Sequence, residues 1–398
     1  MRDHDLIRSI GERPGRNAWL EVDTGALRRN ARRLQKIVQP ARILPMIKAD
    51  AYGLGAVAVA DALAPVDPYA FGVATVGEGM ALRAAGVTER IVVFSPSRAD
   101  DVVTLIEHRL EPVVLSPASM QRFADEALAA ALSLPVHLEV DTGMGRAGLS
   151  WEGVDRWSEA AAAVMKEGSL TLESTFSHFH SADSDDAATR GQLARFEGAV
   201  EALLALGVNP GLLHVANSPA ALADPSYHLN LVRPGLYLFG GGRKVVGGEH
   251  SPPEPVVRVC ARVLEVRDLP EGATVSYGAT FVTTRASRLA TLGIGYADGF
   301  PHGASNRAGV LLDGRRVPIR GAVCMDLTVV DVTGVDGVRP GSVATLLGRE
   351  GDEEITLHEL AEAAGAIEYE VLTGLGAGLP RVIVDRGRTE METLTHVE

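Results

Sequence analysis

A lysine stands at the end of an otherwise apolar stretch of the sequence, ILPMIKA, in which Lys48 carries the only charge. Burying an ammonium group is costly unless the amine is neutralised, paired with an anion or used covalently. Such an amine can bond a carbonyl group as a Schiff base; in the plainer interpretation the lysine stem is buried and its charged end reaches solvent. Lys48 is therefore the first candidate for chemistry.

Further polar residues stand where other apolar or β-branched stretches end. They are Glu139, Asp141 and Arg146 in HLEVDTGMGR, residues 177–180 in FSHFH, Asn217 and Ser218 in HVANS, and Arg233 before Pro234 and Gly235. Each also has an ordinary structural explanation. His178 can be a core histidine, Ser218 a helix N-cap before Pro219, and Arg146 a surface charge. What distinguishes them is that each stands at the end of a strand-like stretch, and such ends recur along the chain.

That recurrence follows an alternation of strand-like and helix-like segments between residues 43 and 238. Runs rich in β-branched residues alternate with Ala- and Leu-rich amphipathic runs, about every 27 residues, which is typical of a βα repeat. The predicted strands are 43–48, 70–75, 90–95, 111–116, 134–142, 170–179, 212–217 and 229–239; the predicted helices include 25–38, 53–64, 117–132 and 151–168. Eight such units predict a (β/α)8 barrel, and a doubly wound open sheet is the alternative.

A barrel would bring the polar residues together, because the carboxyl ends of its strands face one pocket. Ser218 and the amides after Gly235 follow the seventh and eighth predicted strands, where barrels commonly bind phosphate. A reactive lysine, a phosphate cradle and an arginine together predict pyridoxal 5'-phosphate, held on Lys48 as a Schiff base.

A second region, with a different residue pattern, follows the Gly- and Pro-rich segment 240–255, which is expected to be a linker. Strands are predicted at 256–269, 287–296, 321–334 and 341–348, and the only predicted helix is 356–366, with Thr356 as its N-cap. The expected domains are a barrel over 17–245 and a mostly β domain over 246–398. Segment 18–23 does not fit the barrel repeat, which leaves it available to pair with the β domain.

Composition excludes several classes of protein. The chain has 398 residues and a formal net charge of −13, which disfavours nucleic acid and anionic membranes as partners. Its two cysteines, Cys260 and Cys324, argue against a disulfide scaffold or a cysteine-based metal site. The sequence has no run of 18 apolar residues, and residues 1–16 do not have the pattern of a secretory signal. A cytoplasmic enzyme acting on a small molecule is expected.

The chain resembles the alanine racemases, which are fold-type III pyridoxal-phosphate enzymes, across both predicted domains. The resemblance is carried, in the family's order, by AWLEVDTGALRRN (18–30), PMIKADAYGLG (45–55), FGVATVGEGMALRAAG (71–86), VDTGMGRAGL (140–149), FSHFHSAD (176–183), HVANSPA (214–220), LVRPGLYLFG (231–240), VSYGATF (275–281), GIGYADGF (293–300), VCMDLTVVDV (323–332) and YEVLTG (369–374).

The resemblance implies a role for each matching residue. Lys48 would carry the cofactor and act as one base, and Tyr277 would act as the second base from the other subunit of a homodimer. Arg233 would face the pyridine nitrogen, with His178 behind it. Residues implied to bind the cofactor further include Tyr52, Asn217, Ser218, Tyr369 and the amides of Gly235 and Leu236. Arg146 and the Met325 amide would bind the substrate carboxylate, and Tyr296 would narrow the entrance. The implied reaction interconverts L- and D-alanine, with D-alanine used for peptidoglycan.

Four departures from the family pattern bear on substrate range. Leu54 stands where histidine is frequent, Asp50 where asparagine is frequent, and 372–380 lacks an arginine. Glu139 stands where many members have a carbamylated lysine, and we expect its carboxylate to orient Arg146 through a hydrogen bond.

Three alternatives remain open. They are a racemase with other or broader substrates, a pyridoxal-phosphate-binding protein without turnover, and a fold-type III decarboxylase. The decarboxylase would need an acidic partner for the pyridine nitrogen, where this chain has Arg233.

Overall fold

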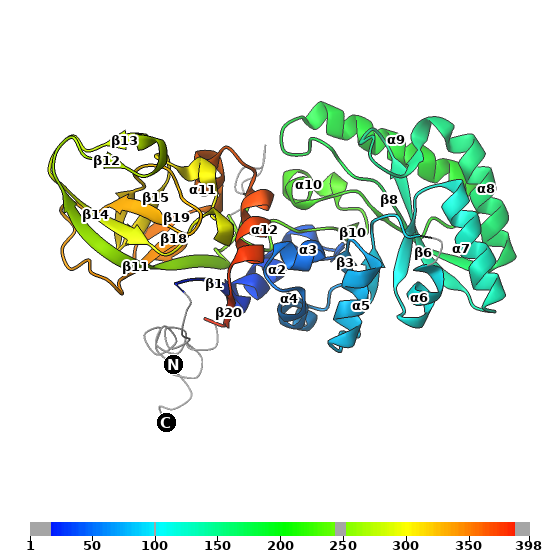
Figure 1. Ribbon diagram of the computed structural model, residues 1–398. Helices are drawn as coiled ribbons and strands as arrows, with labels where there is room; N and C mark the ends of the chain where they lie inside the picture. The colour runs from blue at the N-terminus through cyan, green and yellow to red at the C-terminus, as the bar shows by residue number, and fades with distance from the viewer. Residues whose placement is uncertain (1–16, 99–100, 243–251, 387–398) are drawn as a thin grey trace, which may run out of the picture.

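The computed structural model describes residues 17–98, 101–242 and 252–386. In Figure 1 a helix-rich region built around parallel strands stands beside a region rich in sheet. The parallel strands are β2 (Arg42–Ile43), β3 (Phe71–Val73), β4 (Ile91–Val93), β5 (Glu111–Val114), β6 (Leu134–Asp141), β8 (Leu170–Phe176), β9 (Leu212–His214) and β10 (Leu231–Val232). They correspond one to one with the eight predicted strands.

These strands form a closed barrel. Strands β3, β4, β5, β6, β8 and β9 pair in that order, and β10 pairs with β2. A parallel bridge between Met46 and Gly72 joins the β2 segment to β3. On the other side, the Asn230 amide donates to the Leu213 carbonyl at 2.9 Å, which joins the β10 segment to β9. The predicted barrel is therefore confirmed, and the open sheet is excluded.

Several predicted strands are shorter in the structure. The first, expected over 43–48, ends at Ile43, and the last, expected over 229–239, ends at Val232. Pro45 and Pro234 follow these ends and have no amide hydrogen to continue a ladder. Lys48 consequently begins a short helical turn instead of ending a strand.

Helices surround the barrel, on which they bury apolar side chains. In α2 (Thr24–Val38), for example, the Asp23 carboxylate accepts hydrogen bonds from two amides of the first turn, and Leu27, Ala31 and Leu34 are buried. The remaining helices of the barrel region are α3 (Lys48–Tyr52), α4 (Ala56–Leu63), α5 (Val76–Ala84), α6 (Val102–Glu107), α7 (Pro117–Ala129), α8 (Val154–Glu167), α9 (Asp186–Ala205) and α10 (Ser218–Ala223). Five of these barrel helices in the described residues (α2, α5, α7, α9 and α10) begin at a capping side chain. In the described ranges, no helix has the length and apolar character needed to cross a membrane.

The second region is a mixed sheet that takes in the start of the described chain. Strand β1 (Ala18–Asp23) pairs antiparallel with β11 (Val257–Leu269) and parallel with β20 (Arg381–Val384), so segment 18–23 does belong to this sheet. Its other strands are β14 (Ser287–Leu292), β15 (Gly309–Leu312), β16 (Arg315–Pro318), β17 (Thr328–Asp331), β18 (Val343–Glu350) and β19 (Glu353–Ile355), and β12 (Thr274–Val275) and β13 (Phe281–Val282) form a separate hairpin. The boundary expected between residues 245 and 246 lies outside the described residues.

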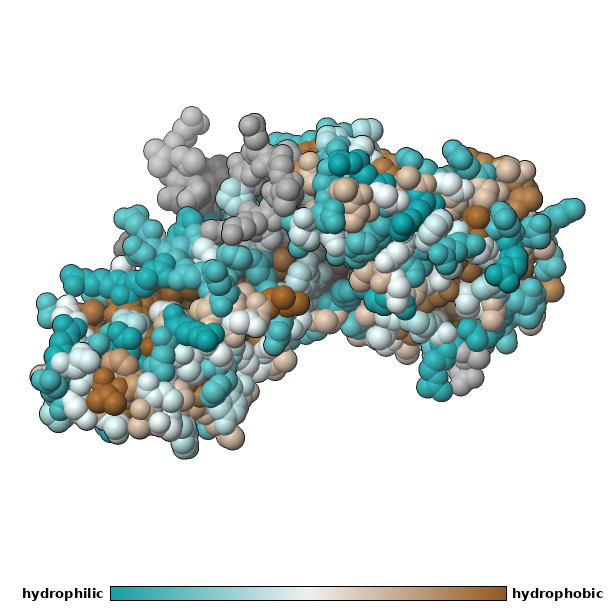
Figure 2. All heavy atoms as spheres, turned by 90° about the horizontal axis from the view of Figure 1, so that it is seen from above, coloured by the Kyte–Doolittle hydropathy of each residue, from teal (hydrophilic) through white to brown (hydrophobic). Residues whose placement is uncertain are grey.

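Two helices accompany the sheet, although only one was predicted. Helix α11 (Leu357–Ala364) begins as expected, with the Thr356 hydroxyl accepting from the Glu359 amide. Helix α12 (Glu368–Gly378) is absent from the prediction because its glycines disfavour a helix. In Figure 1, α12 lies between the barrel and the sheet. Figure 2 shows the two regions as lobes joined at a narrower waist, with hydrophilic and hydrophobic residues interspersed over both.

Candidate active site

A cavity of about 200 Å³ opens at the carboxyl ends of the barrel strands. It brings together most of the residues that the sequence predicted for the site. The lining residues are Met46, Lys48, Tyr52, Phe94, Glu139, Arg146, Phe176, His178, Asn217, Ser218, Arg233, Gly235 and Tyr369.

Lys48 enters this cavity from a strained turn. The four residues 49–52 have φ values between 53° and 59°, the left-handed region, although none is glycine. Such a conformation costs about 1–2 kcal/mol per residue, so other contacts must hold it. The Ala49 amide donates to Glu78 at 2.9 Å, and the Ala56 amide donates to the Asp50 carboxylate at 2.7 Å. The turn thereby directs both Lys48 and Tyr52 at the cavity.

The Lys48 amine is unpaired and accessible from the cavity. It makes no hydrogen bond or ion pair with any residue in the described part of the chain. The protein atoms around it displace water and lower its pKa, and the positive charges of Arg146 and Arg233 act in the same direction, against Glu78. Lowering this pKa favours the neutral amine, which is the form that attacks a carbonyl group.

In the same cavity, a polar cradle is formed by Tyr52, Ser218 and Gly235. A Cβ atom at position 235 would lie 2.1 Å from the Tyr52 hydroxyl oxygen, so only glycine allows this approach. The Gly235 amide donates to Ser218 Oγ at 3.0 Å. Asn217, rather than Ser218, caps α10, because its side chain accepts from the Ala220 amide at 3.1 Å. The Ser218 hydroxyl is therefore available to the cradle.

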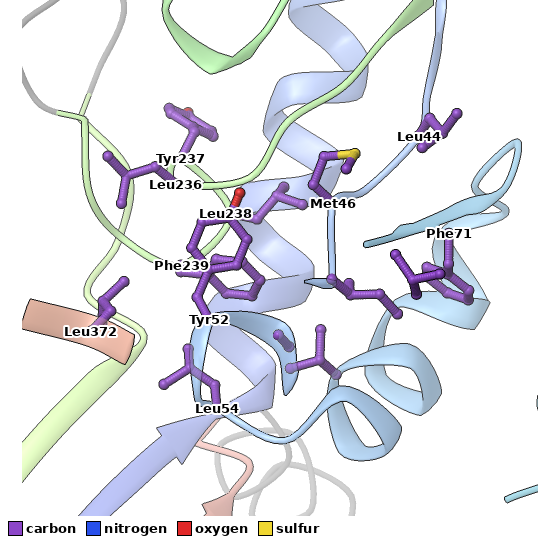
Figure 3. Close-up of a cluster of buried hydrophobic side chains, with 14 of the residues drawn as sticks. Leu44, Met46, Tyr52, Leu54, Phe71, Leu236, Tyr237, Leu238, Phe239 and Leu372 are labelled. Carbon is purple, nitrogen blue, oxygen red and sulfur yellow. The ribbon is translucent and has the colours of Figure 1, made fainter. Parts of the chain in front are cut away.

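Aromatic rings fix the position of Tyr52 in the cradle. Its ring centroid lies 4.9 Å from that of Phe239 and 5.8 Å from that of Tyr369. Burial, with a smaller contribution from Tyr369, raises the pKa of Tyr52, so its hydroxyl stays protonated and can donate to an anion. Figure 3 shows Tyr52 among buried apolar side chains, with Leu54 and Leu372 beside it.

Two of the departures from the family pattern have local structural roles. Leu54 is fully buried in this apolar cluster and does not line the cavity. Asp50 pairs with Arg381 at 2.6 Å while it accepts from the first turn of α4. Glu139 is thus the one position among 50, 54 and 139 that faces the cavity.

Arg233 is the buried cation of the site. Its Nη1 donates to His214 Nδ1 at 2.7 Å, and its Nη2 donates to the Ser177 carbonyl at 2.7 Å. His178 Nδ1 lies farther away, at 3.2 Å from Nη2. Burial lowers the pKa of Arg233 to about 10, against the opposing effect of Glu139, so the guanidinium is still charged at neutral pH. His178 therefore lies beside Arg233 as expected, but His214 makes the shorter contact.

Sequence reasoning missed His214. It is fully buried at the end of β9, and its ring stacks on Phe176 with centroids 4.9 Å apart. The signal was available, because His214 stands in the apolar run LLHVA just as Lys48 stands in ILPMIKA. Burial and the charge of Arg233 lower the pKa of His214 well below its usual value, so its ring is neutral.

Glu139 and Arg146 face the cavity without touching. Glu139 on β6 is 6% exposed, whereas Arg146 lies on the exposed loop that follows. Burial raises the pKa of Glu139 to about 7, while Arg233 and Arg146 partly oppose this shift. Contrary to expectation, the two side chains form no hydrogen bond with each other in the described residues 17–98, 101–242 and 252–386. Their interaction in this structure is electrostatic.

Three predicted residues lie away from the cavity, on the sheet-rich region. Tyr277, Tyr296 and Met325 are 76%, 46% and 53% exposed. We call them the exposed cluster, because hydrogen bonds tie their loops together. The Ser276 hydroxyl donates to the Ala322 carbonyl at 2.6 Å, two residues before Cys324.

Hydrogen bonds also join the loop of Tyr296 to the loop of Met325. The Tyr296 amide donates to the Cys324 carbonyl at 3.0 Å, and the Ala297 amide donates to the Met325 carbonyl at 2.9 Å. In Figure 1 the β12–β13 hairpin, which flanks Tyr277, lies at the far end of the sheet region from α3. Tyr277 therefore does not reach Lys48 of its own chain.

The cavity fits pyridoxal phosphate at three points. The unpaired Lys48 amine suits its aldehyde, and the cradle that glycine keeps open at position 235 suits its phosphate. The guanidinium of Arg233 can only donate hydrogen bonds, and it therefore suits an unprotonated pyridine nitrogen.

Comparison with known proteins agrees with this fit. The chain is 37% identical over 371 residues to an alanine racemase of Carboxydothermus hydrogenoformans, which covers 93% of this chain and 100% of that protein. The crystal structure of alanine racemase from the D-cycloserine-producing Streptomyces lavendulae superposes with a TM-score of 0.89 at 32% identity, covering 94% of this chain and 99% of the other. The structure of alanine racemase from Bartonella henselae, which has covalently bound pyridoxal phosphate, gives a TM-score of 0.84 at 28% identity, covering 93% and 100%.

Family models account for both regions of the chain. The N-terminal domain of alanine racemase matches residues 22–242, and the C-terminal domain of alanine racemase matches residues 256–383. The chain therefore belongs to the alanine racemase family of pyridoxal-phosphate-dependent enzymes.

Proposed function

We propose that this protein interconverts L- and D-alanine, with pyridoxal phosphate carried by Lys48. The observation that carries the proposal is the gathering of an unpaired lysine, a polar cradle and a buried arginine around one cavity. When bound, the cofactor supplies an electron-withdrawing ring that acidifies the Cα–H bond of an attached amino acid. The protein must then supply groups that take and return the proton.

Racemisation needs a proton-transfer group on each face of the substrate, since the proton leaves one face and returns to the other. Lys48 Nζ serves one face. Tyr277 of the partner subunit serves the other, and its exposure in the single chain leaves its hydroxyl free to enter a neighbouring cavity. Racemase activity would then require a homodimer with shared active sites.

His178 is placed to hold that second base. Its Nδ1 faces an N–H group of Arg233 at 3.2 Å and must accept, so the neutral ring carries its proton on Nε2. Burial, together with Arg233, lowers the pKa of His178 well below its usual value, which keeps the ring neutral. Nε2 can therefore donate to the hydroxyl oxygen of Tyr277 from the partner subunit.

The remaining groups bind and restrict the substrate. Arg146 would bind the substrate carboxylate, together with the Met325 amide of the partner subunit, and the partner's Tyr296 would narrow the entrance. Arg233, as a donor, would keep the pyridine nitrogen unprotonated, which limits decarboxylation and transamination. The reaction would supply D-alanine for peptidoglycan in the cytosol, where the two free cysteines of the chain stay reduced.

Chiral analysis of the product tests the proposal. Purified protein loaded with pyridoxal phosphate should convert L-alanine to a mixture approaching equal amounts of both enantiomers. Lys48→Ala should abolish the conversion, and Lys166→Ala, which alters a lysine outside the cavity, is the matched control. Cofactor binding without D-alanine would favour a binding protein, and faster turnover of other amino acids in a substrate panel would favour a broader racemase.

A further inference from the structure

A chain of hydrogen-bonded side chains runs from Arg233 into the barrel interior. Arg233 Nη1 lies 2.7 Å from His214 Nδ1, and His214 Nε2 lies 2.9 Å from Ser174 Oγ. Ser174 Oγ lies 2.6 Å from His137 Nδ1, and His137 Nε2 lies 2.9 Å from Glu111 Oε2. Ser174, His137 and His214 are fully buried, and among the five residues from Arg233 to Glu111 only Arg233 lines the cavity. We call these five residues the barrel relay.

The protons in the barrel relay can be assigned by starting from Arg233. A guanidinium has no acceptor, so His214 Nδ1 must accept from Arg233, and the neutral ring then carries its proton on Nε2. That proton points at Ser174 Oγ, whose single hydrogen is left to be donated to His137 Nδ1. With a neutral ring, His137 then carries its own proton on Nε2 and donates it to the Glu111 carboxylate. All four hydrogen bonds run in one direction, from a cation to an anion.

At the other end of the relay, Glu111 is held by a residue outside the cavity. Arg90 binds Glu111 with two hydrogen bonds, at 2.7 and 2.8 Å, and also binds Glu173 at 2.6 Å. The guanidinium of Arg90 lies over the ring of Tyr69, 4.8 Å from its centroid. Burial acts against the negative charge of Glu111, but the hydrogen bonds from His137 and Arg90 outweigh it and lower the pKa of Glu111. The relay therefore ends on a fixed carboxylate.

We propose that Glu111 is a positioning residue of the active site, because its carboxylate, at the opposite end from Arg233, favours the same relay direction and so stabilises the tautomer of His214 that presents a lone pair to Arg233. Reversing the relay would place N–H of His214 against N–H of Arg233 and would turn the guanidinium away from its present orientation. The inference rests on the proposed function only in taking Arg233 to face the cofactor. The proton positions within the relay do not depend on that function.

Two substitutions interrupt the relay in different places. Ser174→Ala removes the hydroxyl that joins the two histidines. Glu111→Gln replaces one carboxylate oxygen by an NH2 group, which faces Arg90 Nε in one orientation and both Arg90 Nη2 and His137 Nε2 in the other. Thr175→Val is the matched control, since it deletes a buried hydroxyl of the same strand that binds the Pro210 carbonyl at 2.8 Å, outside the relay.

Nitrogen NMR of histidine-labelled, cofactor-free protein tests the relay directly. In the unsubstituted protein, His214 and His137 should both be protonated on Nε2 and not on Nδ1, and each interrupting substitution should give His214 a mixture of tautomers. Protonation of His214 on Nδ1 in the unsubstituted protein, or a His214 tautomer unchanged by both substitutions, would overturn the proposal. This result is independent of whether D-alanine is formed.

Kinetics of the loaded enzyme tests the consequence for Arg233. Each interrupting substitution should lower kcat about tenfold or more, the size expected when a buried hydrogen bond to a charged group is lost, with the KM for alanine within about twofold. Thr175→Val should leave both constants nearly unchanged. If the interrupting substitutions lower kcat no more than Thr175→Val does, Glu111 has only a structural role and the proposal is wrong.

Discussion

The backbones of Gly53 and Gly376 are in direct contact. A Cβ atom at position 376 would lie 2.2 Å from the Gly53 carbonyl oxygen, and one at position 53 would lie 2.8 Å from the Gly376 Cα atom. Gly53 ends the left-handed turn that begins at Lys48, and Gly376 lies in α12, the helix that carries Tyr369. This contact joins the element that bears Lys48 to the sheet-rich region.

Gly376→Ala should therefore disturb both partners of this contact. The added methyl group cannot be accommodated without separating α3 from α12, which should lower the free energy of unfolding by about 1–3 kcal/mol. Pyridoxal phosphate should also bind more weakly, because Tyr52 and Tyr369 lie on the separated elements. Denaturant unfolding and cofactor titration measure the two effects.

Gly198→Ala is the control for this substitution. Gly198 lies within α9, and nothing comes within 4 Å of a Cβ atom placed there. Alanine should stabilise this helix by about 0.5–1 kcal/mol. Equal effects of the two substitutions would mean that the contact with Gly53 has no energetic role.

Lys48 should carry the cofactor, because it is the unpaired amine of the cavity. Loaded protein should absorb visible light, and borohydride should fix a pyridoxyl group on the peptide that contains Lys48. Peptide mapping that finds the group on another lysine, such as Lys36 or Lys166, would contradict this assignment.

Tyr277 should act across subunits. Tyr277→Phe should suppress solvent deuterium exchange into L-alanine far more than into D-alanine, because the proposed mechanism has one base for each face. Equal suppression for both enantiomers would point to a single base.

Mixing two inactive variants tests where Tyr277 acts. A dimer of one Lys48→Ala chain and one Tyr277→Phe chain contains one site with both bases intact. Random mixing should then restore about a quarter of the original activity, since half of the dimers are mixed and each has one active site. Two variants that stay inactive after exchange of subunits would show that each site is built from one chain.

The sequence predicted the barrel and most of the cavity because both follow from local patterns. Lys48, Arg146 and Arg233 could be assigned to one pocket once the repeat placed them at strand ends. The barrel relay could not be predicted in this way. Ser174, His137 and Glu111 come from three strands, and the register between β6 and β8 shifts at Val136 and His137, so their meeting depends on pairing geometry.

Helix α12 escaped prediction for a different reason. Its glycines lower helix propensity, and they are required because Gly376 contacts Gly53 and Gly378 contacts Asp298, where a Cβ atom would lie 2.3 Å away. Tertiary contact thus overrides local preference at this helix.

The pKa of Glu139 gives a prediction on stability. Because burial raises this pKa from 4.5 to about 7, the folded protein holds a proton that the unfolded chain has lost. The unfolded state then binds fewer protons, and the stability contributed by the protonated form is lost as pH rises through this range. In cofactor-free protein, Glu139→Gln should thus gain stability over the unsubstituted chain between pH 5 and 8, by at most about 3 kcal/mol.

The same titration should govern how Glu139 affects substrate binding. Charged Glu139 interacts electrostatically with Arg146, the proposed ligand of the alanine carboxylate, and glutamine has no charge to offer. Above pH 7, Glu139→Gln should raise the KM for alanine, with a loss of about 1–3 kcal/mol as the limit set by a direct charged hydrogen bond. Below pH 6 the native residue is itself neutral, so the two proteins should have similar KM values. Because a glutamate needs no dissolved carbon dioxide to become an anion, the native rate should not change with bicarbonate. A KM difference that stays the same from pH 6 to pH 8 would show that the charge of Glu139 does not act on Arg146.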